Sequence, residues 1–224
     1  EIAQCLVGSE MCIRDSMSTV YLSTAYFAPI SYYASFLRYD RIVIEQWCNY
    51  TKQTYRNRCH IAGANGLLAL SVPIVKPDTI KCPTKDIRIS DHGEWRHLHW
   101  NAIASAYGSS PFFEYYQDDI RPFFEKRYEF LLDFNEEIRR TVCNLIGIEP
   151  HIEYSSSYSE PAPGETDLRD VIHPKRRKAE TILPVQLKPY YQVFSEKYGF
   201  QPDLSIIDLL MNMGPESILI LQNT

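Results

Sequence analysis

The sequence predicts a single α/β domain over residues 17–224, with a small mixed sheet flanked by helices and a helical C-terminal half. Three observations predict this architecture. A strand–helix–strand pattern occupies residues 19–46, a hairpin signal lies at Asn65-Gly66, and helical periodicity dominates from residue 91 onward. A strand, a helix and a second strand in succession favour a sheet that is covered by helices.

The first unit consists of two short strands around a helix. "TVYL" at 19–22 and "RIVIE" at 41–45 are rich in β-branched residues, which is typical of strands. Between them, after Pro29, apolar residues recur at helical spacing: Ile30, Tyr33, Ala34 and Leu37.

The next unit is a hairpin. In "YRNRCHIAGANGLLALSVPIV" two strand-like runs are joined around Asn65-Gly66, the strongest two-residue hairpin signal, and Pro73 and Pro77 end the second run. "DIRIS" at 86–90 predicts a further short strand.

The pattern then changes to helices. A helix is expected over 91–108, because Asp91 and Glu94 have capping-box spacing and Gly108 is a stop signal. Ser110 is expected to cap the following helix.

A long helix is expected from about Pro122 to Ile146, closed by Gly147. "HIEYS" at 151–155 predicts a strand, and "DLSIIDLLMNMG" predicts an apolar helix with Asp203 or Ser205 near its cap. Residues 155–181, rich in Ser, Pro and charge, predict a mobile loop or lid.

The first sixteen residues do not resemble the rest. Residues 6–16, "LVGSEMCIRDS", correspond codon by codon to the transposon-end adapter used in sequencing libraries. They lack the basic start and apolar core of a secretory signal. We therefore expect residues 1–16 to be a non-native, adapter-derived scar, with Met17 as the start.

Charge, cysteine pattern and apolar content restrict the classes of function that the chain can have. The formal charge is −5, and it becomes −3 when Glu1, Glu10, Asp15 and Arg14 are left out, so no general attraction to nucleic acid is expected. The four cysteines outside the prefix form no CxxC, and no apolar run is long enough for a membrane span. The sequence thus predicts a cytoplasmic protein with reduced thiols and leaves its oligomeric state open.

The densest polar stretch is residues 49–61. Strand alternation would place Arg56 and Arg58 on one face, where Arg can bind a phosphate or carboxylate through two hydrogen bonds. The same pattern is typical of a solvated edge strand that is protected by charge. Both interpretations stay open.

Two further residues are candidates. His99 shares a helix face with Trp95 and could be a general base or a histidine at the edge of the core. Asp208 lies inside an apolar helix and must be capped, paired or functional; a salt bridge to Arg58 would account for both residues. The basic run at 175–178 is expected to be solvated or to close over a phosphate.

No metal site is predicted, because the histidines of "HLHW" diverge on a helix. The chain also lacks a Walker loop, GxGxxG, GxSxG, HExxH and DxD, which argues against P-loop enzymes, Rossmann dehydrogenases and serine hydrolases. No cofactor is identified.

In order along the chain, "KQTYRNRCHIAGANGLLALSVPI", "DIRISDHGEWRHLHWNAIASAYGSSPFF" and "YYQVF…GFQPDLSIIDLLMNMGPES" resemble the WbqC-like family of bacteria. The resemblance covers nearly all of residues 17–216. It implies a role in O-antigen or other surface polysaccharide biosynthesis, with glycine transfer as one suggested activity. Matched onto this chain, the motifs point to Lys52, Asn57, Arg58, Asn65, Gly66, Trp95, His99, Tyr107, Gln192, Ser205 and Asp208.

Residues and resemblance together predict a transferase that modifies a sugar nucleotide or another sugar precursor by glycyl or aminoacyl transfer. Lys52 and Arg58 would hold the anionic group, and His99 would be the base. Asn57, Gln192 and an amide near Gly66 would stabilise the oxyanion, and Asp208 would orient Arg58 or His99. The other members of the set, Asn65, Trp95, Tyr107 and Ser205, would bind substrate.

Two alternatives remain. The chain could be a non-catalytic module that binds a nucleotide-sugar or scaffolds other glycan enzymes. It could also be a small-molecule enzyme unrelated to glycans, responding to ATP or free amino acids.

Overall fold

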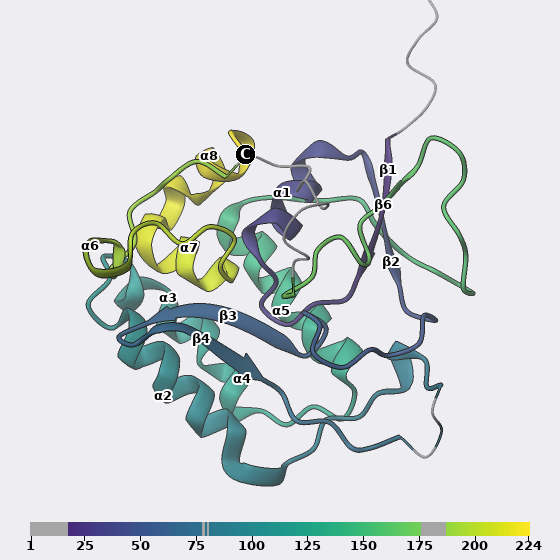
Figure 1. Cartoon of the computed structure of the whole chain (residues 1–224), viewed down its shortest axis with the longest axis horizontal. Coiled ribbons are helices and arrows are strands. Elements are labelled where there is room, and N and C mark those ends of the chain that lie inside the picture. Colours follow the sequence, from purple (N-terminus) through teal and green to yellow (C-terminus); the bar gives the residue numbers. More distant parts are fainter. Residues whose placement is uncertain (1–17, 78, 80, 176–186) are drawn as a thin grey trace, which may run out of the picture.

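The architecture combines a parallel sheet, a separate hairpin and a set of helices (Figure 1). It is given by a computed structural model, which describes residues 18–77, 79, 81–175 and 187–224. The predicted scar at 1–16 and residues 176–178 of the basic run lie outside this described part of the chain.

The main sheet has four parallel strands in the order β5-β2-β1-β6. They are β1 (Thr19–Ser23), β2 (Arg41–Glu45), β5 (Ile152–Tyr154) and β6 (Thr166–Asp167). Helix α1 (Ile30–Arg38) connects β1 to β2, so the predicted strand–helix–strand unit is confirmed. The strands pair in register from Thr19↔Arg41 to Ser23↔Glu45, which places their carboxyl ends at one edge.

The predicted hairpin is also confirmed, as a two-stranded antiparallel sheet of β3 (Arg58–Gly63) and β4 (Gly66–Ser71). Its loop is Ala64-Asn65, one residue earlier than expected, because Gly63 pairs with Gly66. The mixed α/β class therefore holds. The parallel and antiparallel pairings lie in two separate sheets among the described residues.

The helices occupy the middle and the end of the chain. They are α2 (Trp95–Tyr107), α3 (Phe113–Ile120), α4 (Pro122–Glu125), α5 (Leu131–Ile146), α6 (Ser195–Tyr198), α7 (Ile206–Met213) and α8 (Ser217–Gln222). Short 3-10 turns occur at Thr84–Asp86, His92–Glu94 and Gly214–Glu216. In Figure 1 the sheet and the C-terminal helices lie on opposite sides, with α1 and α5 between them.

The prediction of one continuous helix over 122–146 is wrong in one respect. The helix is split into α4 and α5 because the chain is extended at Phe130 and residues 129–131 pair with 87–89: Ile89 N–H donates to Glu129 O at 2.9 Å, and Leu131 N–H donates to Ile87 O at 2.9 Å. "DIRIS" is correspondingly held by isolated bridges, Ile74↔Ile89 and Arg88↔Phe130, instead of forming a strand. The predicted stop at Gly147 is confirmed, with the left-handed φ of +77° that ends α5.

Helix starts differ from the capping predictions. Helix α2 begins at Trp95, after a 3-10 turn, and no side chain caps it. Ser110 donates its hydroxyl to Tyr107 O at 2.6 Å, so it closes the end of α2 and does not cap α3. Ser205 is the N-cap of α7, since its Oγ accepts from Ile207 N–H at 3.3 Å.

The segment before α7 fastens the C-terminal helices to the rest of the molecule. Ser205 N–H donates to His60 O of β3 at 2.8 Å, and its hydroxyl donates to Phe27 O at 2.7 Å. Asp203 accepts from Ser31 N–H in the first turn of α1 at 2.9 Å. One short stretch thus joins the hairpin, the β1–α1 loop and α7.

Residues 155–175, predicted as part of a lid, are packed on the sheet over part of their length. They contribute β6, which pairs with β1, and Ser155, which is buried. The tertiary pairing with β1 is a contact that composition could not reveal. The remainder of the predicted loop, residues 176–181, lies outside the described residues.

Candidate functional site

Asp208 lies at the centre of a buried hydrogen-bond cluster. Its Oδ1 accepts from Tyr107 Oη at 2.9 Å, and its Oδ2 accepts from Tyr190 Oη at 2.5 Å and from Gln192 Nε2 at 2.9 Å. The structure therefore brings together three residues of the predicted set, Tyr107, Gln192 and Asp208. Burial raises the pKa of Asp208 above its ordinary value, while the three donors act in the opposite direction.

The expected salt bridge between Arg58 and Asp208 is wrong. Arg58 is half-buried, and its Nε donates to Ser71 Oγ at 2.8 Å. Its neighbour Asn57 donates from Nδ2 to Val72 O at 2.8 Å. Both side chains therefore brace the start of the hairpin, whereas Asp208 is satisfied by hydroxyl and amide donors.

His99 lies in the aromatic core. It is 6% exposed, its Nδ1 is 2.9 Å from Tyr26 Oη, and its ring meets Trp95 edge-on at 5.2 Å between centroids. Burial lowers the pKa of His99 to about 4, against a hydrogen bond with the backbone of Ser71. The ring is thus neutral at pH 7 and held by polar partners, as expected for a histidine at the edge of the core.

The remaining predicted residues do not join these groups. Lys52 and Asn65 are exposed; Asn65 lies in the hairpin loop, and Gly66 begins β4 beside it. That loop rests on α6, where Lys197 Nζ and Tyr198 Oη each donate to Ala64 O at 2.8 Å. The predicted set is therefore distributed over the hairpin, the aromatic core and the Asp208 cluster.

A different location has the features of a ligand site: the carboxyl edge of the parallel sheet. From β1 the chain proceeds to β2 and then β5 on one side, and it returns to β6 on the other side of β1. The direction of winding thus reverses between β1 and β6. In open parallel sheets, ligands bind at the carboxyl ends of the strands, at such a reversal.

A small cavity lies at this reversal. It is lined by residues that follow β1, by the segment before β3 and by residues after β6: Leu22, Ser23, Thr24, Ala25, Tyr32, Thr54, Tyr55, Arg56, Leu168, Arg169 and Ile172. We call it the switch-point cavity. Its open space is about 270 Å³ including the solvent at its mouth, and its inner part has room for about one water-sized group.

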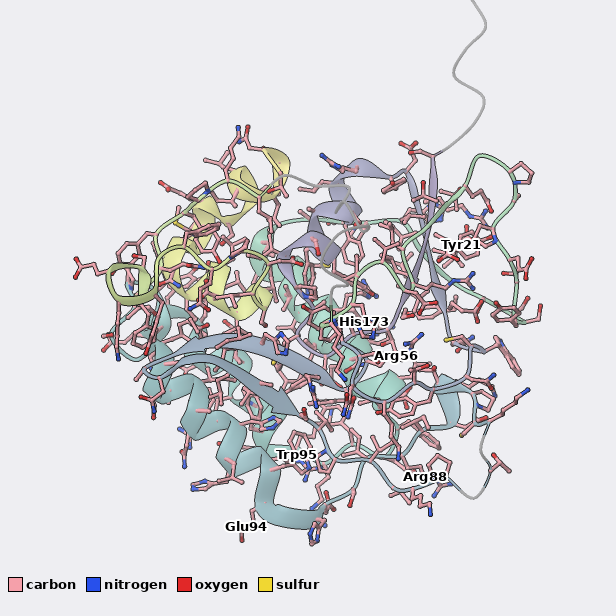
Figure 2. All side chains as sticks on the ribbon, in the orientation of Figure 1. Tyr21, Arg56, Arg88, Glu94, Trp95 and His173 are labelled. Carbon is pink, nitrogen blue, oxygen red and sulfur yellow. The ribbon has the colours of Figure 1, made fainter. Side chains whose placement is uncertain are left out.

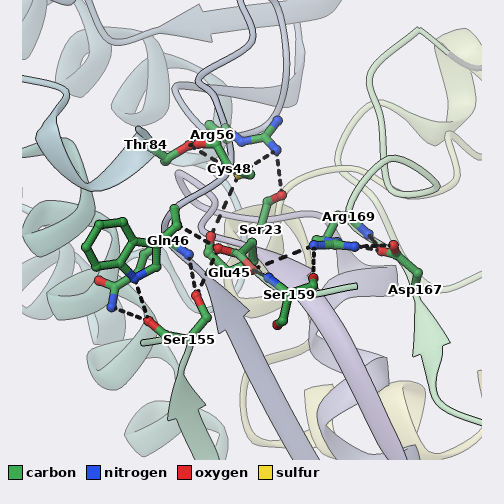
Figure 3. Close-up of polar contacts among 11 residues, drawn as sticks. Ser23, Glu45, Gln46, Cys48, Arg56, Thr84, Ser155, Ser159, Asp167 and Arg169 are labelled. Atoms are coloured by element: carbon green, nitrogen blue, oxygen red, sulfur yellow. Dashed lines mark hydrogen bonds and ion pairs between the residues drawn. The ribbon is translucent and has the colours of Figure 1, made fainter. Parts of the chain in front are cut away.

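Arg56 is the distinctive residue of the switch-point cavity. It is 4% exposed, and its Nη2 donates to two uncharged partners, Ser23 Oγ at 2.8 Å and Cys48 Sγ at 3.4 Å (Figure 3). Its Nε is buried and has no hydrogen-bond partner among the described residues, and neither has the hydroxyl of the neighbouring Thr24. In the view of Figure 2, Arg56 lies near the middle of the molecule.

The other charges at this edge are compensated. Arg169 donates to both carboxylate oxygens of Asp167, at 2.9 and 2.6 Å, and to Ser159 O at 3.0 Å. The fully buried Glu45 accepts from Trp47 N–H at 2.7 Å and Ser155 Oγ at 2.9 Å, and it lies 3.7 Å from Arg169 (Figure 3). No ion pair within the described chain involves Arg56.

A buried cation with no carboxylate beside it is costly unless an anion reaches it. The predicted alternation of Arg56 and Arg58 on one strand face is wrong, because the strand begins only at Arg58 and Arg56 turns inward from the preceding loop. Sequence reasoning missed Ser23, Thr24 and Arg169. A signal was available for Ser23 and Thr24, which follow the predicted strand at 19–22, but not for Arg169, because β6 was not predicted.

In the described ranges, no cluster of three or more His, Cys, Asp or Glu side chains is arranged to hold a metal ion. None of the helices found there has the length and apolar character needed to cross a membrane.

A model of the WbqC-like protein family matches residues 24–186. The chain belongs to this family. The matched range of the WbqC-like domain contains Thr24, Arg56 and Arg169. Of the Asp208 cluster it contains Tyr107, and it ends before Tyr190, Gln192 and Asp208.

This WbqC-like chain is also similar to a protein of Mycobacterium tuberculosis, the uncharacterized protein Rv1507c. The two are 26% identical over 214 residues, which cover 86% of this chain and 89% of the relative. No solved structure matches the chain significantly.

The Asp208 cluster yields a prediction about pH. Because the folded-state pKa of Asp208 is raised, its contribution to stability is fully present below the unfolded pKa of about 4 and is lost as the pH rises through the folded pKa. The free-energy advantage of wild type over Asp208→Asn, measured by urea unfolding, should therefore be largest near pH 4 and smaller at pH 7. An advantage that grows with pH would mean that the three donors outweigh burial.

Proposed function

We propose that this WbqC-like protein binds a small anionic metabolite at the switch-point cavity, with Arg56 holding its phosphate or carboxylate. The observation that carries the proposal is the buried guanidinium of Arg56, which has no acidic partner and an unpartnered Nε in the described structure. Guanidinium groups bind phosphate and carboxylate through charge-assisted hydrogen bonds.

The geometry also limits how the ligand binds. The inner cavity accepts about one water-sized group, so an anionic oxygen enters it while the body of the ligand stays at the mouth. Thr24 and Ser23 supply hydroxyls beside Arg56, and Arg169 lines the cavity while bound to Asp167. A phosphorylated sugar precursor, such as a sugar nucleotide, has this form, and the family resemblance to surface-polysaccharide proteins favours that class.

This site supports the binding hypothesis more directly than the transferase hypothesis. A glycyl or aminoacyl transfer needs a base beside the attacking group, and His99 does not line the switch-point cavity. Its ring is in contact with Tyr26 and Trp95 in the core. The transferase assignment, with its cytoplasmic setting, remains a prediction from sequence.

Arg56→Gln tests the proposal. A glucose 1-phosphate or nucleotide-sugar concentration about 100-fold above Kd should stabilise wild type by about 2.7 kcal/mol, a Tm rise of about 5–10 °C. The variant should lose this rise, yet its unliganded stability should be unchanged or higher, because an uncompensated buried charge has been removed. Thermal unfolding with and without ligand measures both effects.

Arg58→Gln is the matched comparison, two residues away and outside the cavity. It should keep the ligand-induced Tm rise. If Arg58→Gln loses the rise and Arg56→Gln keeps it, the site predicted from the sequence is right and the switch-point proposal is wrong.

His99→Gln separates binding from catalysis. Because His99 is a core residue in this structure, the substitution should lower the Tm while leaving the saturable response to phosphate ligands intact. In a transfer assay, a rate that falls by 100-fold or more in a folded variant with unchanged ligand affinity would restore the histidine as the base.

A further inference from the structure

A second, larger hollow lies on the outer side of α2 and α4. It is lined by Glu94, Arg96, His97, Trp100, Arg121, Phe124 and Glu125, and its volume is about 510 Å³. None of these residues lines the switch-point cavity. We call it the α2–α4 hollow. Figure 2 shows Glu94, the residue before α2, at the lower edge of the molecule, and Arg56 nearer the middle in this view.

Arg96 lines this hollow and has two donor nitrogens without a partner in the described structure. Its Nη1 donates to Asp91 Oδ1 at 2.6 Å, and its guanidinium carbon lies 4.7 Å from the centre of the Trp95 ring. Its Nε and Nη2 are buried and have no hydrogen-bond partner within the described residues. These two N–H groups form one edge of the guanidinium and point in parallel, which is the arrangement that binds both oxygens of a carboxylate.

The side chain of Arg96 is already held in place by its neighbours. Asp91 fixes one nitrogen, and the indole of Trp95 covers one face of the guanidinium. A ligand that binds the remaining edge does not have to order a free arginine, so less side-chain entropy is lost on binding.

Aromatic rings line the same hollow. Trp100 lies 6.0 Å from Phe124 and 6.1 Å from Phe113, ring centre to ring centre. Such rings offer an apolar face to the flat or ring-shaped body of a ligand. The Nε of Arg121 is paired with Glu125 at 2.7 Å, whereas Arg96 has two buried donors without a partner in the described structure.

We propose that the α2–α4 hollow binds an organic carboxylate with a ring-shaped body, its carboxylate on the Nε–Nη2 edge of Arg96 and its ring against Trp100 and Phe124. The ring can be aromatic or that of an acidic sugar, since both combine a flat or C–H-rich face with one carboxylate. This site is separate from the proposed phosphate site, so the two proposals can fail independently.

The test is a titration of the full chain with phenylacetate and with glucuronate, followed by calorimetry and by tryptophan fluorescence. At least one of the two should bind saturably, and its uncharged counterpart, phenylacetamide or glucose, should bind about 10- to 100-fold more weakly because the paired charged hydrogen bonds are lost. Which acid binds distinguishes the aromatic from the sugar source.

Two arginine variants sharpen the experiment. Arg96→Gln should weaken carboxylate binding by about 10- to 100-fold. Arg127→Gln is the matched control, because Arg127 contacts the other oxygen of Asp91 at 3.4 Å, is largely exposed and does not line the hollow. It should bind like wild type, and the Arg56→Gln variant should do so as well.

If Arg96→Gln does not fold, Trp100→Leu replaces it, and the same carboxylate should then bind at least several-fold more weakly. No saturable binding of either acid, or equal binding of acid and amide, overturns the proposal. So does an Arg96→Gln variant that keeps the wild-type affinity.

Discussion

The buried positive charge of Arg56 is the constraint around which the carboxyl edge of the sheet is arranged. Arg56 is 4% exposed, so its guanidinium loses most of its hydration, and its hydrogen-bond partners in this structure are a hydroxyl and a thiol. The strand ends around it already use their own charges: Glu45 is held by Ser155 and by Trp47 N–H, and Arg169 is held by Asp167. An anion brought by a ligand is the component that would complete this edge.

Comparison with Asp208 shows why burial alone does not identify a functional residue. Asp208 is as deeply buried as any charged residue of the described chain, but three donors surround its carboxylate and join α2, α7 and the segment at 190–192. The hydrogen bonds that its carboxylate accepts all come from the protein itself. Arg56 and Arg96 differ because each has donor nitrogens that no described residue uses. Unused donors, more than burial, mark the places where a ligand would gain free energy.

Local sequence patterns were sufficient for much of the fold. The strands at 19–23 and 41–45, the hairpin and the stop at Gly147 follow from β-branched runs, turn residues and caps, which act over a few positions. For the N-cap of α7 the sequence left Asp203 and Ser205 open, and the structure selects Ser205. The break between α4 and α5 could not be predicted that way, because it arises from pairing of residues 129–131 with 87–89. The strand β6 was missed for the same reason, since its partner β1 is far away in sequence.

The prediction of the candidate site was limited in the same way. Sequence singled out the polar stretch that contains Arg56 but assigned the anion to Arg58, because regular strand alternation cannot show that the chain turns inward at Thr54–Arg56. The contribution of Thr24 and Arg169 depends on which strands are neighbours in the sheet, and that order is a property of the whole fold.

The most direct test of this account is a crystal structure of the chain soaked with tungstate, a heavy phosphate analogue whose position anomalous scattering reveals. The account predicts an anomalous peak in the switch-point cavity, with an oxygen within hydrogen-bond distance of Arg56 Nε and Thr24 Oγ1. A cavity closed by protein side chains, with tungstate bound only elsewhere on the molecule, would contradict it.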